Sequence, residues 1–168
     1  NLFFLFVAKN RGSKWANKVY EFFRGGVSIM DNVNFNAEKN GELKIVKVLN
    51  QYKGLVVFDV GANVGDWSVM LTQNPKIHAF EILPDTYNLL KRNLGSKDNI
   101  FINNVGLSNE NGTMEVHLSQ HSDVTTAHKL KGVNQHENYY CSTEICKIIK
   151  AENYIEQNQI DVIDFLKI

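Results

Sequence analysis

One segment near the middle of the chain constrains the fold more than any other. Residues 55–60 form a continuous apolar and β-branched run, Leu-Val-Val-Phe-Asp-Val, and Gly-Ala-Asn-Val-Gly follows directly at 61–65. A strand that is apolar on both faces is typical of a parallel sheet covered on both sides by helices. Glycine then allows a sharp turn out of such a strand. The segment therefore predicts the first strand of a parallel α/β sheet.

The residues after this turn continue the alternation of helices and strands. Consecutive β-α-β units use crossovers of one hand, which places their strands side by side in one parallel sheet. The predicted fold class is therefore α/β, with a Rossmann-like, doubly wound and mostly parallel sheet. From apolar periodicity we predict a helix at 66–73 with Asp66 as its N-cap, a strand at 76–81, a helix at 85–94 with Leu89, Leu90 and Leu94 inward, and a strand at 99–105.

Further elements flank this core. An alternating run at 112–118 follows Asn-Glu-Asn-Gly at 109–112, a hairpin-type turn signal, and predicts an inserted strand pair. Residues 119–143 are polar and irregular in pattern. The remaining predicted elements are helices at 14–23 and 38–52 before the core, and after it a strand at 145–149, a helix at 151–158 and, at 162–168, a fourth parallel strand beside the first.

Length and hydrophobic content set the domain organisation. With 168 residues, 43% of them hydrophobic, the chain suits one compact domain. We expect a Rossmann-like domain at 35–168 after a helical or irregular segment at 1–34. The chain starts with Asn1 rather than Met and ends on an apolar run at 162–168, so we expect a fragment that is incomplete at its C-terminal side.

Charge and cysteine content exclude several classes of partner. Eighteen Lys and Arg residues balance eighteen Asp and Glu residues, so no net field favours nucleic acid or an anionic membrane, and a small-molecule partner fits better. The apolar opening at 2–8 is about a third of the length that spans a bilayer. Cys141 and Cys146 match no zinc or redox motif, which predicts reduced thiols and a cytoplasmic protein. The oligomeric state stays open.

The glycine turn carries the first signal of function. Dinucleotide sites typically use G-x-G-x-x-G, so that pyrophosphate lies on the N-terminus of the following helix. Here the spacing is G-x-x-x-G, from Gly61 to Gly65, and Asp59 precedes it. A carboxylate at this position repels pyrophosphate. It suits instead a ligand with a cationic amino group, such as S-adenosylmethionine.

Two further signals lie at the ends of the next predicted strands. Glu81, twenty residues after Gly61, is placed to accept hydrogen bonds from both hydroxyls of a ribose, as the acid at this spacing does in nucleotide sites. Asn104 and Val105 end the third strand, where this topology places adenine. Each feature also has a structural interpretation, as turn glycine, strand-end acid or capping group. Their combination and order favour a nucleoside site.

The same residues resemble the motifs of the FkbM-type methyltransferases. Residues 56–68, Val-Val-Phe-Asp-Val-Gly-Ala-Asn-Val-Gly-Asp-Trp-Ser, resemble motif I of that family. The resemblance covers about 35–168. Its other parts are Asn-Gly-Glu at 40–42, Ala-Phe-Glu-Ile-Leu-Pro at 79–84, which resembles the acidic second-strand motif, Asn-Val-Gly-Leu-Ser at 104–108 with Gly112, which resembles the third-strand segment, and Ile-Asp-Phe-Leu-Lys-Ile at 163–168, which resembles the lead-in to the next motif.

The resemblance implies transfer of a methyl group from S-adenosylmethionine to a hydroxyl oxygen, often of a sugar or a secondary metabolite. The loop at 122–126 is similar to a serine-rich stretch of the family, and we expect this loop to approach the cofactor. Two departures concern the C-terminal part: the family's Asp-x-Glu-Gly motif would follow Ile168, and its Leu-Asp pair is missing near 151–154. The resemblance assigns Asp59, Gly61, Asn63 and Gly65 to the methionine end, Glu81 to the ribose, and Asn104 and Val105 to the adenine.

The sequence does not name a catalytic base or a metal site. Metal is not required, because the sulfonium is already an activated methyl donor and the protein's task is to align the acceptor oxygen. His121 and His128 lie in the polar insertion, where a loop histidine is usually solvated. His117 and His121 have i, i+4 spacing, but on a predicted strand this does not form the shared site it would form on a helix.

Two other functions stay open. A nicotinamide-dependent oxidoreductase would use the same sheet, but its G-x-G-x-x-G turn is missing. A non-catalytic module would keep the fold as an interaction surface, and the short C-terminal side motivates that alternative. The methyl acceptor is not determined by these residues, because fold-level analogy alone supports a hydroxyl group.

Overall fold

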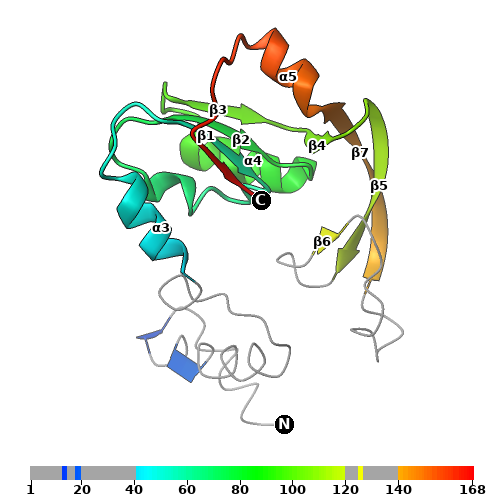
Figure 1. Cartoon of the computed structure of the whole chain (residues 1–168). Coiled ribbons are helices and arrows are strands. Elements are labelled where there is room, and N and C mark those ends of the chain that lie inside the picture. Colours follow the sequence, from blue (N-terminus) through cyan, green and yellow to red (C-terminus); the bar gives the residue numbers. More distant parts are fainter. Residues whose placement is uncertain (1–12, 15–17, 20–40, 120–124, 127–139) are drawn as a thin grey trace. The chain divides into compact units, whose positions relative to one another are not determined.

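The structure is a computed structural model of the chain, and it describes residues 13–14, 18–19, 41–119, 125–126 and 140–168 (Figure 1). The chain divides into two compact units, Asn1–Val48 and Leu49–Ile168. The elements in chain order are α3 (Glu42–Leu49), β1 (Val56–Val60), η1 (Ser68–Met70), β2 (Lys76–Phe80), α4 (Pro84–Leu94), β3 (Ile100–Asn103), β4 (Gly106–Ser108), β5 (Gly112–Ser119), β6 (Thr125–Thr126), β7 (Tyr140–Lys150), α5 (Ala151–Gln157) and β8 (Phe165–Lys167).

The two helices predicted ahead of the core are described in part. Of the first, at 14–23, Lys14, Lys18 and Val19 are helical and the rest lies outside the described residues. The second, predicted at 38–52, is the shorter helix α3, and it starts where the carbonyl of Gly41 accepts the first backbone hydrogen bonds. Within the described ranges, no helix has the length and apolarity needed to cross a bilayer.

Four parallel strands form the central sheet in the order β3-β2-β1-β8. β1 pairs with β2 from Val56↔Lys76 onward and with β8 up to Asp59↔Lys167. The backbone N–H of Asp164 donates to the carbonyl of Val56 just ahead of β8. All strand pairings in this sheet are parallel. The predicted α/β class with a parallel central sheet is confirmed, and so is the placement of the last strand beside the first.

One face of this sheet is aromatic, and α5 covers it. Tyr154 of α5 packs its ring against Phe58, His78 and Phe80, with centroids 5.9, 5.6 and 4.7 Å away. The Tyr154 hydroxyl lies 2.8 Å from Nδ1 of His78. All four side chains are buried. Edge-to-face rings and a satisfied buried hydroxyl therefore fix α5 to the sheet.

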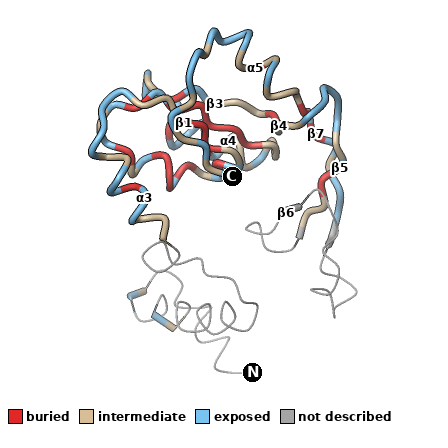
Figure 2. Tube along the Cα trace, viewed as in Figure 1, coloured by how far each residue is buried: buried red, intermediate tan, exposed pale blue. Residues whose placement is uncertain are grey.

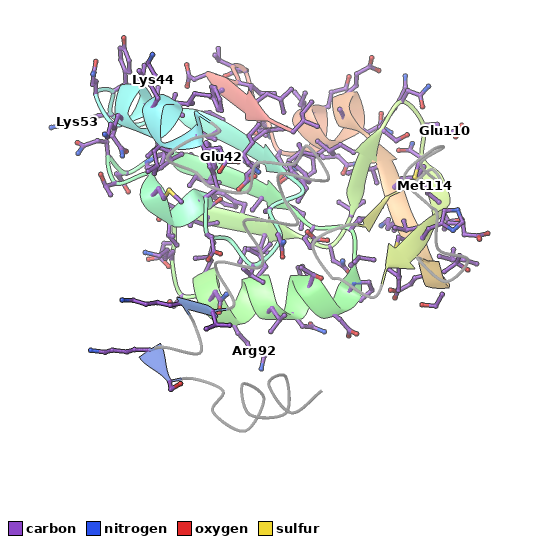
Figure 3. The ribbon with its side chains drawn as sticks, turned by 90° about the horizontal axis from the view of Figure 1, so that it is seen from below. Glu42, Lys44, Lys53, Arg92, Glu110 and Met114 are labelled. Atoms are coloured by element: carbon purple, nitrogen blue, oxygen red, sulfur yellow. The ribbon has the colours of Figure 1, made fainter. Side chains whose placement is uncertain are left out.

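The opposite face carries aliphatic side chains. Val57 lies beside Ile77 in the β1–β2 ladder, both fully buried, and the buried residues concentrate on these strands (Figure 2). Figure 3 shows α4 and α5 on opposite sides of the sheet. Leu90 and Leu94 of α4 are buried as predicted. The inward prediction for Leu89 is wrong, with 39% of that residue exposed, because successive helix residues point about 100° apart.

The predicted helix at 66–73 is wrong. The chain forms only the short turn η1, with no side-chain cap at its start, so Asp66 does not act as an N-cap. The side chain of Asn50 donates to the carbonyl of Met70 and accepts from the N–H of Thr72, each at 2.8 Å. In a longer α-helix, that carbonyl and that N–H would instead form hydrogen bonds within the helix. A tertiary contact therefore ends the helix after one turn.

The inserted strand pair exists, but its pairing differs from a hairpin. The second sheet has the order β4-β7-β5-β6, with β7 parallel to β4 and antiparallel to β5. The loop at 109–111 passes the end of β7, where the N–H of Lys150 donates to Asn111 at 2.8 Å. Because β7 lies between them, β4 and β5 are about 10 Å apart, too far for a two-residue hairpin turn.

Gly65 marks the closest approach of α4 to the turn after β1. A Cβ at this position would lie 2.5 Å from Cδ1 of Leu94 and 2.9 Å from Cδ1 of Leu90, and φ is +94°. We expect Gly65→Ala to lower the free energy of unfolding by about 2–4 kcal/mol, because overpacking adds to the cost of a left-handed backbone. Urea titration measures the loss.

The matched control for this substitution is Gly54→Ala. Gly54 has φ +66°, and a Cβ there would meet nothing within 4 Å. This variant carries the backbone cost alone, about 1 kcal/mol. Equal losses for the two variants would contradict the packing role of Gly65.

The buried His78 predicts a pH-dependent stability. Burial, with a smaller contribution from Lys76, lowers the pKa of His78 from 6.5 to about 4. Because the unfolded chain binds this proton at higher pH than the folded chain, the stability is fully present above pH 6.5 and is lost as the pH falls toward 4. Urea titration of the wild type should show a slope of up to about 1.4 kcal/mol per pH unit. His78→Gln should flatten it; an unchanged slope would refute this assignment.

Candidate functional site

The residues that the sequence predicts for a ligand site lie at the ends of β1, β2 and β3, at one edge of the central sheet. The N–H groups of Gly61 and Ala62, after β1, both donate to the carbonyl of Phe80 at 2.9 Å. The N–H of Glu81, after β2, donates to the carbonyl of Asn103 at 2.9 Å. The carboxyl edge of a parallel sheet is the usual ligand position in α/β folds. The residues that the sequence predicts for one site therefore lie close together in the structure.

The side chain of Glu81 ties the glycine turn to the end of β2. Its Oε2 accepts from the N–H of Asn63, and its Oε1 accepts from the N–H of Leu83, each at 3.0 Å. Only 7% of Glu81 is exposed. A carboxylate has about four acceptor positions, so Glu81 keeps capacity for a further donor.

The charge of Glu81 is costly to bury. Burial raises the pKa of this carboxyl, and the hydrogen bonds from the backbone at Leu83, Asn63 and Ile82 work in the opposite direction. The negative charge of Asp59 raises the pKa a little further. A carboxyl held in this way gains from any donor that approaches its remaining lone pairs.

The two glycines of the turn have different surroundings. Gly61 has φ +75°, and a Cβ there would meet no atom of the described residues within 4 Å. Gly65 faces the leucines of α4 instead, so its missing side chain serves packing. Asn63 lies between them at φ +50°, a conformation that asparagine tolerates better than most residues. Of the predicted glycines, Gly61 is the one with open space for a ligand.

Asn104 and Val105, the residues predicted to border adenine, lie next to the segment that follows β2. The side chain of Asn104 donates to the carbonyls of Glu81 and Ile82, at 2.8 and 3.2 Å. Val105 is buried in the core cluster with Phe58 and Phe80, so its side chain belongs to the core. Asn104 therefore supports the segment that follows Glu81, and Val105 supports the core.

Asp59 lies inside the structure, with both oxygens engaged. It has no exposed surface. The Ser68 hydroxyl donates to Oδ2 at 2.8 Å, and the Lys167 ammonium of β8 donates to Oδ1 at 3.0 Å. The same ammonium lies 5.6 Å from the ring centroid of Trp67, and that ring stacks on Phe165. The sequence interpretation missed Ser68 and Lys167.

One signal could have pointed to Lys167. Side chains alternate along a strand, so Phe165 and Lys167 share a face of β8. In a parallel ladder, Lys167 opposite Asp59 points to the same side as that carboxylate. The register itself, however, depends on contacts between segments 108 positions apart. A one-residue shift would have turned Lys167 to the other face.

The second sheet adjoins this edge through β4 and β7. A Cβ on Gly106 would lie 2.7 Å from Cδ1 of Ile82 and 3.3 Å from Cγ2 of Ile148, so the two sheets meet closely there. Cys146 of β7 is buried and free. Burial raises the pKa of its thiol, and the Glu144 and Glu81 carboxylates raise it further. β7 therefore borders the surroundings of Glu81, which the sequence pattern did not indicate.

Other predicted residues fall on parts of the chain that are only partly described. Of the loop at 122–126, Thr125 and Thr126 form β6 and pair with β5, and the rest lies outside the described residues. His121 and His128 also lie outside them. His117 sits on β5 opposite Thr126. Across the described residues, no group of three or more His, Cys, Asp or Glu side chains is placed to hold a metal ion.

Comparison of the chain with protein-family models, with curated proteins and with solved structures finds no match. The residues at the carboxyl edge of the sheet offer one carboxylate with spare acceptor capacity, at Glu81, one open glycine, at Gly61, and one buried ion pair, between Asp59 and Lys167.

The ion pair predicts a large stability effect. Lys167→Met leaves the Asp59 carboxylate buried without its cation, and we expect a loss of about 3 kcal/mol in the free energy of unfolding. Asp59→Asn combined with Lys167→Met removes both charges and should recover more than half of that loss. Urea titration of the two single variants and the double variant gives the coupling. Additive losses would show that the two groups do not interact.

Proposed function

We propose that this chain binds S-adenosylmethionine at the carboxyl edge of its parallel sheet, as a class I methyltransferase of the FkbM type. The proposed reaction is methyl transfer to a hydroxyl group of a sugar or a secondary metabolite. The observation that carries the proposal is the position of Glu81, which leaves the end of β2 and bonds to the turn after β1.

The geometry of Glu81 suits a ribose. Its carboxylate keeps acceptor capacity beyond its bonds to the backbone, and a ribose offers two neighbouring hydroxyl donors. Because burial raises the pKa of this carboxyl, two additional donors would offset part of the cost of its charge. The open side of Gly61 allows a ligand to approach the backbone of the turn.

Asp59 fits the proposal less directly than its motif suggests. It is fully buried and paired with Lys167, so it offers no surface to the amino group of a ligand. Its role in the proposed site is to hold Lys167 and Ser68 in place. The pyrophosphate of a nicotinamide cofactor has no counterpart here either, since the turn lacks the G-x-G-x-x-G spacing and leads into η1 instead of a helix.

When bound, S-adenosylmethionine supplies an activated methyl group: the acceptor oxygen bonds to the methyl carbon as the carbon–sulfur bond breaks, its electrons stay on sulfur to give S-adenosylhomocysteine, and the hydroxyl proton passes to water or a base. The residues of this chain would bind and orient the nucleoside through Glu81 and the turn at 61–63. Alignment of the two reactants supplies much of the rate enhancement in such a reaction.

Calorimetric titration of S-adenosylmethionine tests the proposal. We expect saturable binding by the wild type and at least about tenfold weaker binding by Glu81→Gln, because the amide replaces one charged acceptor with a donor. The control is Glu110→Gln, an exposed glutamate on the turn between β4 and β5 (Figure 3). It should bind like the wild type.

The other outcomes separate the alternatives. Binding of a nicotinamide nucleotide without binding of S-adenosylmethionine would overturn the proposal in favour of an oxidoreductase. Binding of S-adenosylmethionine without methyl transfer to any offered hydroxyl compound would favour a non-catalytic module. Equal binding by Glu81→Gln and the wild type would remove Glu81 from the site.

A further inference from the structure

In the ion pair beside β1, Lys167 is the member with exposed surface. Asp59 has no exposed surface, and each of its oxygens accepts a hydrogen bond. The Lys167 side chain, by contrast, is 23% exposed. An incoming group can therefore reach the lysine side chain of the ion pair, whereas the carboxylate offers it no surface.

The ammonium of Lys167 has donors to spare. A lysine carries three N–H donors. In the described part of the chain, its side-chain hydrogen bond is the one to Asp59, at 3.0 Å. The ring of Trp67 lies 5.6 Å away and limits the positions of the side chain. With respect to the described residues, Lys167 is thus an ammonium held by Asp59 that has further N–H groups to donate.

Lys167 and Glu81 lie on opposite sides of the end of β1. Lys167 belongs to β8 and pairs with Asp59, whereas Glu81 follows β2, which pairs with β1 on its other side. The two flanking strands are about 10 Å apart, two strand spacings. In S-adenosylmethionine, the ribose and the carboxylate stand at opposite ends of the part that contains the sulfonium. A ligand that lies across the end of β1 would reach both residues.

We infer that Lys167 binds the carboxylate of the amino-acid end of the ligand, with Asp59 as the positioning residue that holds its ammonium in place. The inference rests on the proposed function and deepens it, because it assigns a residue to the anionic end of the cofactor. It also reverses the expectation for this position. The Asp59 carboxylate faces inward, and in this inference its partner Lys167 carries the charge that binds the ligand.

The test compares S-adenosylmethionine with its decarboxylated analogue, which keeps the sulfonium and the nucleoside. Calorimetric titration of the wild type should give at least about tenfold weaker binding of the analogue, the usual worth of a charge-assisted hydrogen bond. Lys167→Met should lose the same factor for S-adenosylmethionine and should bind the two compounds equally. Lys150→Met, which removes a lysine from an exposed ion pair with Glu152, is the matched control and should keep the wild-type ratio.

Loss of folding in Lys167→Met would not block the test. The double variant Asp59→Asn/Lys167→Met removes both charges of the pair, and it should be folded by circular dichroism. It should also bind the two compounds with equal affinity. The wild-type comparison needs no variant at all.

The outcomes distinguish this inference from the proposed function. If the wild type binds neither compound, the proposed function is wrong and the inference falls with it. If the wild type binds both compounds equally, the proposed function stands and the inference is wrong. Tighter binding of S-adenosylmethionine by either Lys167 variant would also overturn it, because Lys167 would then be competing with the ligand for the space at the edge.

Discussion

A salt bridge between the buried Asp59 and Lys167 joins β1 and β8, the first and last strands of the central sheet in chain order. Asp59 has no exposed surface, and its charge is balanced by Lys167, which lies 108 positions further along the chain. An uncompensated charge in such a place would cost several kcal/mol, so the pairing favours one register of β8 against β1. Trp67, from the turn after β1, contacts both the Lys167 ammonium and the ring of Phe165. The turn after β1 and the strand β8 therefore depend on one electrostatic constraint.

The two acidic residues at the strand ends have different roles because their surroundings differ. Both oxygens of Asp59 accept hydrogen bonds from internal partners, Ser68 and Lys167. Among the described residues, Glu81 accepts hydrogen bonds from backbone N–H groups, including those of Asn63 and Leu83, and a carboxylate with about four acceptor positions keeps capacity beyond these bonds. The two acids, which belong to neighbouring motifs, thus differ: Asp59 is fully paired inside the structure, and Glu81 keeps acceptor capacity. Burial and partner chemistry make this difference, and the motif spacing does not.

The sequence predicted the central sheet well and the connections poorly. β1, β2 and α4 match their predicted ranges closely, because apolar periodicity within a short window decides them. The helix at 66–73 failed because Asn50 takes two backbone groups that a longer helix would use. The hairpin pairing after β4 failed because β7, about forty residues later in the chain, supplies the partner of both strands. Each failure comes from a contact with a distant segment.

The sequence by itself determined the parallel α/β sheet, the glycine turn after its first strand, and the collection of Glu81, Asn104 and the turn at one edge. These follow from local patterns and from the rule that the carboxyl ends of parallel strands share an edge. Only the tertiary structure decided that Asp59 faces inward, that Lys167 is its partner, and that β7 borders Glu81. Strand register and the compensation of a buried charge depend on groups far apart in the chain, and no local window contains both members of such a pair.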